Sequence, residues 1–466
     1  MATREPEQDR ESEIERVEAP SALPDVRVPP PGPRSRELAA RLLAVESPAF
    51  DARRAAREST SGAEQSPIVY ARGRGANVWD ADENRYVDFV AGFGSLSLGH
   101  APREIERAVA DQVSTLGLAL GDVYASEVKV LLCERLAKDF GGAGARVMLG
   151  MSGADAVTAA LKTAALATKK PGVVAFEGAY HGLSYAPLAA CGLNEGFRAP
   201  FAAQLGDHVT FAPYPSDEEG EAAAANELDR TMTAVRAAMK RGDVGAVIVE
   251  PILGRGGCVV PPAGFLPALR DACDGAGALL IADEIWTGLG RSGALLSSVA
   301  AGVVPDLICI GKGLGGGMPI SACIGRAKAM EAWGGHGGSA IHTATHFGAP
   351  LACAAATATL DAIASEQLDV RAREVGDRWV DVLRDRTRDR GVTAVRGRDL
   401  MVGVELEGGA PRALAVARKL LARGYLVLTG GKRGDVLTLT PPLNIDEPLL
   451  GGFASALADV LAERTI

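Results

Sequence analysis

A lysine directly follows an apolar run in Leu307-Ile308-Cys309-Ile310-Gly311-Lys312-Gly313-Leu314-Gly315-Gly316-Gly317-Met318-Pro319. A short continuous apolar run bounded by glycine is typical of a buried strand in a parallel sheet. Lys312 then stands at the end of that strand, where little water reaches its amine. Removal from water lowers the pKa of a lysine, and a neutral amine is a nucleophile toward a carbonyl carbon.

Runs of the same kind occur earlier in the chain, at 146–149, 173–176, 244–249 and 278–282. They alternate with helical patterns, which indicates an α/β fold class with a mostly parallel central sheet and helices on both faces. Ligands bind such sheets beyond the carboxyl ends of the strands. The strand ends are therefore where we expect the functional residues.

The run at 278–282 ends in Asp283. A carboxylate and a lysine on neighbouring strand ends are what pyridoxal phosphate requires. The lysine holds the aldehyde as a Schiff base, and the aspartate keeps the pyridine nitrogen protonated. Taken alone, Lys312 fits a surface lysine in a flexible glycine loop better, because that describes most lysines.

Two further motifs suit the same cofactor. Ser152-Gly153-Ala154 turns a strand into a strong helical pattern, and the free N–H groups of a helix N-terminus bind phosphate. An ordinary serine N-cap explains this motif as well. Tyr180-His181-Gly182 follows the run at 173–176, and an aromatic side chain there can lie on a planar ring or simply pack.

A nicotinamide-binding oxidoreductase is rejected. Gly311, Gly313 and Gly316 have the glycine spacing of a dinucleotide fingerprint. However, Met318-Pro319 breaks the helix that should begin there.

The bulk composition excludes several classes. The 466 residues carry a formal charge of −9, which argues against nucleic acid as the main partner. No apolar run is long enough to cross a bilayer, and the charged N-terminus lacks the apolar stretch of a signal peptide, so we expect no membrane contact and a cytoplasmic protein. The seven cysteines have no disulfide or zinc spacing and no metal site is expected.

The chain divides into four predicted segments. Residues 1–35 are acidic and proline-rich and are expected to form a disordered tail. Residues 36–95, with a helix over 35–57 and a hairpin over 69–89, form the first part of a small lobe. Residues 96–345 form the large cofactor-binding domain, and residues 346–466 form a C-terminal small α+β domain that the N-terminal segment joins in space.

The ordered motifs extend beyond those above. From about residue 75 to the C-terminus they include Leu98-Gly99-His100, Glu250-Pro251, Asp283-Glu284-Ile285, Gly290-Arg291-Ser292-Gly293 and Thr345-His346-Phe347-Gly348. On these motifs the chain resembles the class III pyridoxal-phosphate-dependent aminotransferases, the group that holds 4-aminobutyrate, ornithine and ω-amino-acid transaminases. The resemblance implies a fold-type-I transferase.

The resemblance also implies a role for each site residue. Lys312 would anchor the cofactor and carry the proton between substrate and cofactor, and Asp283 would pair with the pyridinium nitrogen. Ile285 and Tyr180 would cover the two ring faces. Thr345 would reach the phosphate of the neighbouring subunit, which implies a homodimer with shared active sites. The remaining cofactor contacts implied by the motifs are Ser152, Gly153, Ala154, His181 and Glu250.

The departures from the family pattern concern the substrate. Glutamate-using members carry Gln and Glu where this chain has Leu253 and Arg255, often Gln at Trp286, and an arginine at Thr438. All three changes weaken a dicarboxylate site. Arg255 can either supply a replacement guanidinium for a carboxylate or sit in a surface salt bridge. Trp286 and Arg255 are thus the candidate substrate-binding residues.

These observations predict an aminotransferase that moves an amino group from a primary amine or ω-amino acid to a keto acid by a ping-pong mechanism, with pyruvate favoured over 2-oxoglutarate. An aminomutase or racemase on the same fold shares the lysine and the aspartate and stays open as an alternative. A binding-only relative would have no need for the pair of Lys312 and Asp283.

Overall fold

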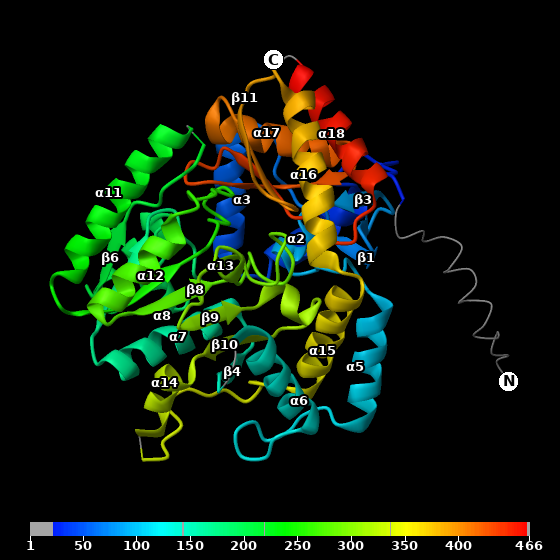
Figure 1. Cartoon of the computed structure of the whole chain (residues 1–466). Coiled ribbons are helices and arrows are strands. Elements are labelled where there is room, and N and C mark those ends of the chain that lie inside the picture. The colour runs from blue at the N-terminus through cyan, green and yellow to red at the C-terminus, as the bar shows by residue number, and fades with distance from the viewer. Residues whose placement is uncertain (1–21, 142–143, 219, 336, 464–466) are drawn as a thin grey trace, which may run out of the picture.

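The computed structural model describes residues 22–141, 144–218, 220–335 and 337–463 (Figure 1). Among these residues, none of the helices combines the length and the apolar character needed to cross a bilayer. A large lobe is built around a seven-stranded sheet, and a smaller lobe with two four-stranded sheets lies above it in Figure 1.

The central sheet has the strand order β4-β10-β9-β8-β7-β5-β6. Its strands are β4 (Arg146–Gly150), β5 (Gly172–Phe176), β6 (Val209–Ala212), β7 (Val244–Val249), β8 (Leu279–Asp283), β9 (Leu307–Ile310) and β10 (Ser321–Gly325). Only β10 runs antiparallel to its neighbours, β4 and β9. The predicted α/β class with a mostly parallel sheet is confirmed. The prediction did not include β6 and β10. The sequence of β10, Ser321-Ala-Cys-Ile-Gly325, is made largely of small residues, and β6 lies at the sheet edge and is not a continuous apolar run.

Helices cover both faces of this sheet. Successive side chains of a strand point to opposite faces, and here both sets are apolar, so both faces must be shielded from water. On one face, α7 (Gly153–Thr168) packs over Ala246 and Ile248. On the other, α11 (Glu221–Met239) and α12 (Phe265–Ala276) pack over Val247 and Val249.

Three further helices close the β4 edge: α5 (Arg103–Thr115), α6 (Glu127–Leu136) and α15 (Pro350–Ser365). The sequence assigned α15 to the C-terminal lobe, but in the structure it packs against α5 and α6 (Figure 1). Its alanine-rich surface allows this close approach, so the large lobe extends to about the end of α15.

The small lobe combines both ends of the chain. The first sheet has the order β1-β2-β3-β13 and the second β11-β12-β15-β14. Their strands are β1 (Tyr70–Arg74), β2 (Asn77–Asp80), β3 (Arg85–Asp88), β11 (Val392–Arg398), β12 (Met401–Leu406), β13 (Tyr425–Leu426), β14 (Leu428–Gly430) and β15 (Val436–Leu439). The helices α16 (Leu368–Thr387), α17 (Gly409–Ala422) and α18 (Glu447–Ala462) cover them. The parallel pairing of β3 with β13 joins the N-terminal and C-terminal segments in one lobe.

Shorter helical segments connect these elements. They are α4 (Ala91–Gly94), α8 (Tyr185–Ala189), α9 (Glu195–Arg198), α10 (Ala202–Leu205), α13 (Ser297–Ala300) and α14 (Ala327–Met330), with η1 (Ala137–Gly141), η2 (Ala199–Phe201), η3 (Lys312–Gly315) and η4 (Glu331–Gly335).

The N-terminal segment differs from its prediction in two respects. Of the expected tail at 1–35, residues 1–21 lie outside the described residues, but residues 22–35 are packed on the small lobe. The side chain of Asn84 accepts hydrogen bonds from the N–H groups of Arg27 (2.8 Å) and Val28 (2.9 Å). The Asn84 side chain thus pairs backbone N–H groups of a segment that has few apolar residues to hold it in place. The single helix expected over 35–57 is two helices, α2 (Pro33–Leu43) and α3 (Pro48–Ser61), because Pro48 disfavours the helical conformation at the residue before it.

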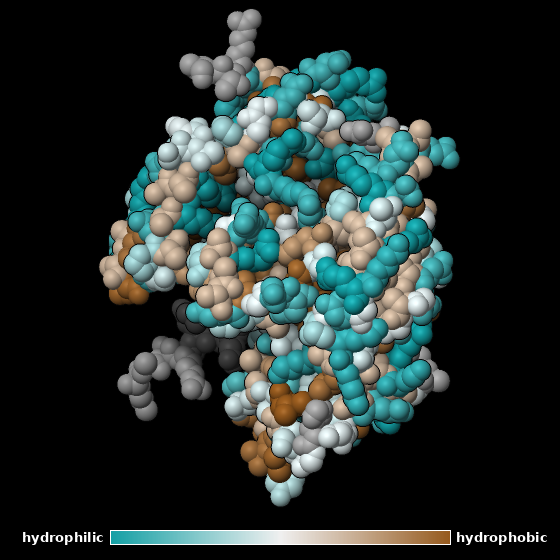
Figure 2. All heavy atoms as spheres, turned by 90° about the vertical axis from the view of Figure 1, so that its left-hand side faces the viewer, coloured by the Kyte–Doolittle hydropathy of each residue, from teal (hydrophilic) through white to brown (hydrophobic). Residues whose placement is uncertain are grey.

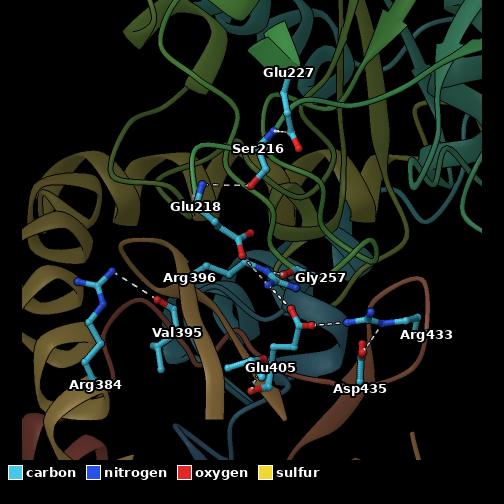
Figure 3. A network of polar contacts seen from close by, with 11 residues as sticks. Ser216, Glu218, Glu227, Gly257, Arg384, Val395, Arg396, Glu405, Arg433 and Asp435 are labelled. Carbon is cyan, nitrogen blue, oxygen red and sulfur yellow. Dashed lines mark hydrogen bonds and ion pairs between the residues drawn. The ribbon is translucent and has the colours of Figure 1, made fainter. Parts of the chain in front are cut away.

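An ion-pair network ties the two lobes together (Figure 3). Arg396 of β11 donates to the carbonyl of Gly257 at 2.8 Å and pairs with Glu218 at 2.9 Å, both in large-lobe loops. The same guanidinium pairs with Glu405 of β12, and Arg396 is only 10% exposed in its side chain. Because the pairs are shielded from water, they hold the loop that ends at Gly257 against the small lobe.

Candidate active site

Lys312 lies where β9 ends, at the first position of the η3 turn. Its backbone has a φ of +40°, a conformation that non-glycine residues rarely adopt and that clusters at functional sites. Burial is the main cause that lowers the pKa of its amine, to about 8. The charges of Arg255 and Arg291 lower the pKa further, while those of Glu250 and Asp283 raise it. A large part of the amine is therefore neutral near pH 8, which is the nucleophilic form.

Asp283 ends β8, the strand beside β9, and is 3% exposed. One carboxylate oxygen accepts from the N–H of Ile285 at 3.1 Å, and the other lies 2.7 Å from Nδ1 of His181. Burial alone lowers the pKa of His181, but its hydrogen bond to Asp283 and the nearby carboxylate charges raise it above its usual value. Nε2 of His181 is buried without a hydrogen-bond partner among the described residues.

Glu250 follows β7 and is buried beside this pair. Its carboxylate accepts from the N–H groups of Tyr180 (2.7 Å) and Gly254 (3.0 Å). Burial and the charge of Asp283 raise its pKa to about 7, against the lowering effect of His181 and the two N–H groups. Glu250 thus fixes the loop of Tyr180 to the loop that carries Arg255.

Arg255 lies on the aromatic ring of Tyr180, with its guanidinium carbon 4.4 Å from the ring centre. In the described part of the chain it forms no ion pair with a carboxylate, so the surface salt bridge considered from the sequence is absent there. Its carbonyl accepts from Gly431 at 2.9 Å, next to Gly430, whose Cα lies beside Thr438. The hydroxyl of Thr438 is buried without a partner among the described residues.

Trp286 covers the lysine. The Lys312 amine nitrogen lies 4.0 Å from the indole centre. The ring fits between two glycines: an added Cβ would lie 2.5 Å from the indole at Gly94 and 2.3 Å from it at Gly254. The sequence singled out Trp286 but neither glycine, since their role depends on a contact between segments far apart in the chain.

The N-terminus of α7 forms the candidate phosphate cup. Ser152 and Asp155 make a reciprocal capping box, while Gly153 and Ala154 are first-turn residues whose N–H groups have no acceptor within the helix. Gly153 lies against Ile285, because an added Cβ there would be 3.0 Å from that side chain. The cup, Ile285 and Asp283 are therefore neighbours, an arrangement that suits a flat ring carrying a phosphate.

Thr345 is not part of this cluster. It lies exposed in the loop before α15. A Cβ added to Gly348 in the same loop would lie 2.8 Å from Lys129 of α6, so the loop runs beside that helix. Within one chain the structure therefore brings together all the predicted site residues except Thr345.

Sequence reasoning missed Arg291 as a site residue. It is 2% exposed, and it donates to the carbonyls of Leu400 (3.0 Å) and Pro441 (2.6 Å). Burial lowers its pKa to about 9. The Gly-Arg-Ser-Gly motif contains this residue, and its buried charge is among the smaller influences that lower the pKa of Lys312.

The comparisons with known proteins agree with this geometry. The family profile described as aminotransferase class-III matches residues 59–461. The chain is 35% identical to the 4-aminobutyrate aminotransferase of Mycobacterium tuberculosis over 455 residues, covering 92% of this chain and 99% of the relative. It is 37% identical to the acetylornithine aminotransferase of Streptomyces clavuligerus over 399 residues, covering 84% and 91%. A solved amine transaminase from an uncultivated Pseudomonas species, in its pyridoxal-phosphate-bound form, aligns with a TM-score of 0.79 at 29% identity and covers 85% of this chain and 95% of that chain.

The fold is that of the pyridoxal-phosphate-dependent transaminases. The chain belongs to the class III aminotransferase family. It is accordingly an aminotransferase with pyridoxal phosphate as its cofactor.

Proposed function

We propose that this enzyme transfers an amino group from a primary amine or ω-amino acid to a small keto acid, in two successive half-reactions at one site. The observation that supports it is the position of the Lys312 amine, with a pKa of about 8, on the strand next to Asp283. When bound there, pyridoxal phosphate supplies an aldehyde for the amine and an electron sink for the bond that breaks.

The chain's own residues bind and orient the reactants. Asp283, held by His181 and by the N–H of Ile285, presents a fixed negative charge to a protonated ring nitrogen. The N–H groups of Gly153 and Ala154 bind the phosphate at the positive end of α7. Lys312 takes a proton from the substrate carbon and returns it during transfer.

We infer that the keto acid is pyruvate rather than 2-oxoglutarate. Thr438 stands where glutamate-using relatives have an arginine, and it is 6% exposed, so no cation is present at that position. Arg255 lies on the ring of Tyr180 beside the cofactor-site residues, and without an ion pair in the described chain it is available to one carboxylate. A single guanidinium suits a keto acid with one carboxylate better than one with two.

A donor panel tests this function. Holoenzyme is supplied with short amines and ω-amino acids against pyruvate or 2-oxoglutarate, and alanine or glutamate is measured. We expect alanine formation to exceed glutamate formation for every accepted donor. Absence of transfer with any donor and acceptor would refute the proposal, and preference for 2-oxoglutarate would refute its acceptor.

We further propose a homodimer in which Thr345 completes the partner's phosphate site. Apolar side chains are exposed on α5, α6 and the loop between them, including Leu120 (64%), Val123 (69%) and Tyr124 (70%). So many exposed apolar side chains within one stretch of the chain are unusual on a monomer and are typical of an obligate interface. Figure 2 shows apolar side chains at the lower end of the molecule, the end at which both α14 and the α5–α6 loop lie in Figure 1. The loop of Thr345 runs beside this surface.

A further inference from the structure

A cavity lies in the small lobe, away from Lys312 and Asp283. It opens to solvent between α3, α17 and the sheet of β1 and β3, and its volume is about 770 Å³. This is within the size range of small-molecule pockets in proteins. Neither Lys312 nor Asp283 lines it, so it is separate from the predicted cofactor-binding residues. We call it the α3 cavity.

The wall of the α3 cavity has an excess of positive charge. Four arginines line it against two carboxylates, and of the four, Arg418 of α17 lies 3.7 Å from Glu64 and donates to the carbonyls of Ser66 and Pro30. Arg53, Arg54 and Arg57 stand on one face of α3, since residues three and four apart on a helix are neighbours. Arg54 pairs with Asp51 at 3.4 Å, but within the described chain neither Arg53 nor Arg57 forms an ion pair.

The two carboxylates do not neutralise these arginines. Asp88 accepts from the N–H groups of Val90 (2.8 Å) and Ala91 (3.0 Å) and pairs with His100 at 2.9 Å, so it is occupied. Glu46, the other carboxylate of the wall, forms no ion pair with an α3 arginine within the described chain. Burial and the charge of Arg53 lower the pKa of Arg57. A half-buried guanidinium beside a like charge is costly unless an anion comes to it.

The rest of the wall is apolar and aromatic. Phe50 of α3 is 54% exposed and Phe93 is 59% exposed, and both line the cavity. Large apolar side chains facing a cavity of this size provide a surface for an apolar ligand body.

Two chain segments connect the cavity wall to the residues around the reacting amine. The residue after Phe93 is Gly94, which contacts Trp286, the residue that covers Lys312. On the other side, Leu428 lines the cavity and begins the β14 strand, which ends at Gly430 beside the carbonyl of Arg255.

We propose that the α3 cavity binds an amphipathic carboxylate, with its carboxylate on Arg53 and Arg57 and its apolar body on Phe50 and Phe93. Paired guanidinium groups bind a carboxylate with charge-assisted hydrogen bonds. This carboxylate is either the remote end of a long substrate or a separate acid that binds beside the active site. The inference concerns binding and stands apart from the acceptor proposed above.

Calorimetry on holoenzyme with 4-phenylbutyrate tests the site, because this probe has an apolar body and a carboxylate but no amine or keto group. We expect saturable binding, and binding of the neutral 4-phenylbutyramide about tenfold weaker or more. Arg57→Ala and Arg53→Ala should each weaken binding of the acid by about tenfold and leave the amide unchanged. Arg57→Lys keeps the charge but loses the planar guanidinium that can donate two hydrogen bonds to one carboxylate, so it should have a smaller effect than Arg57→Ala.

Two control variants make the test specific to this cavity. Arg41→Ala removes an exposed arginine of α2 outside the cavity wall and should not change binding of the acid. Arg255→Ala removes the arginine of the catalytic site and should not change it either. No saturable binding, equal binding of acid and amide, or a loss with Arg255→Ala but not with the α3 variants would overturn the inference.

Steady-state kinetics with the same probe distinguishes the two sources of the ligand. If the cavity holds the remote end of a substrate, 4-phenylbutyrate will raise KM for a long ω-amino acid and leave KM for a short amine unchanged. If it holds a separate acid, both donors keep their KM while the calorimetric binding persists. Either result requires the binding site, and raised KM for the short amine would place the probe in the catalytic pocket and overturn the inference.

Discussion

The amine nitrogen of Lys312 lies 4.0 Å from the centre of the Trp286 indole. An ammonium over the face of a tryptophan is attracted to its π electrons, so the ring holds the side chain in place. Trp286 cannot move aside freely, because the backbones of Gly94 and Gly254 enclose its edges. The indole therefore limits the free volume next to the reacting amine.

Replacing this indole should widen the range of amines. We expect Trp286→Ala to raise the ratio of kcat/KM for a bulky amine to that for a small one by about tenfold, the scale of a pocket-size effect. The ratio is measured in competition between two donors that differ only in bulk. Trp333→Ala is the control, because that indole donates to Thr163 on α7 and should not alter the ratio. An unchanged ratio in Trp286→Ala would show that the indole does not border the substrate.

Removal of the lysine should abolish transfer. Lys312→Ala loses both the group that anchors the cofactor and the group that moves the proton, so kcat should fall below about a hundredth of the wild-type value. Alanine formation from pyruvate gives the measurement. Lys170→Ala, which removes a lysine bound to the carbonyl of Ala276, should keep full activity. Activity above that limit would assign the catalytic amine to another lysine.

The pH dependence of cofactor loading should report the pKa of Lys312. The neutral amine attacks the aldehyde, so the loading rate of cofactor-free protein should rise with pH and level off above about 8. The charge of Arg255 lowers this pKa, and Arg255→Ala should therefore move the midpoint to higher pH. Arg378→Ala, an exposed arginine of α16, should leave the midpoint unchanged. A wild-type midpoint near that of a free lysine, about 10.4, would mean that the amine is not desolvated.

The sequence was sufficient where chemistry follows a continuous apolar run. Lys312 and Asp283 each follow such a run, and parallel strands bring their carboxyl ends together whatever the remaining contacts are. It was insufficient for contacts between distant segments. The position of Trp286 between two glycines depends on the direction in which its side chain points. The charge of Arg57, which has no ion pair within the described chain, depends on how α3 lies on α17. At residues 22–35 the composition predicts disorder. It does not reveal that the side chain of Asn84 holds this segment on the small lobe by hydrogen bonds.

Charge placed on the exposed apolar surface should separate the proposed dimer. Leu120→Glu or Tyr124→Glu would put a carboxylate into an interface of roughly 2,000 Å², where its desolvation is unfavourable. Light scattering should show a monomer, with loss of activity and of bound cofactor. Val382→Glu, on an exposed part of α16, should remain a dimer. An active wild-type monomer at assay concentration would contradict both the dimer and the role of Thr345.

The acceptor preference should depend on Arg255. The wild-type enzyme should have a higher kcat/KM with pyruvate than with 2-oxoglutarate, because Thr438 offers no second cation. Arg255→Ala should raise KM for carboxylate substrates by about tenfold or more, the scale of a lost charge-assisted contact, while simple amines keep theirs. Arg255→Lys keeps the charge and should recover part of the loss. A strong native preference for 2-oxoglutarate that disappears in Arg255→Ala would show that Arg255 has replaced the missing arginine completely. The dicarboxylate site would then have moved from β15 to the loop after β7.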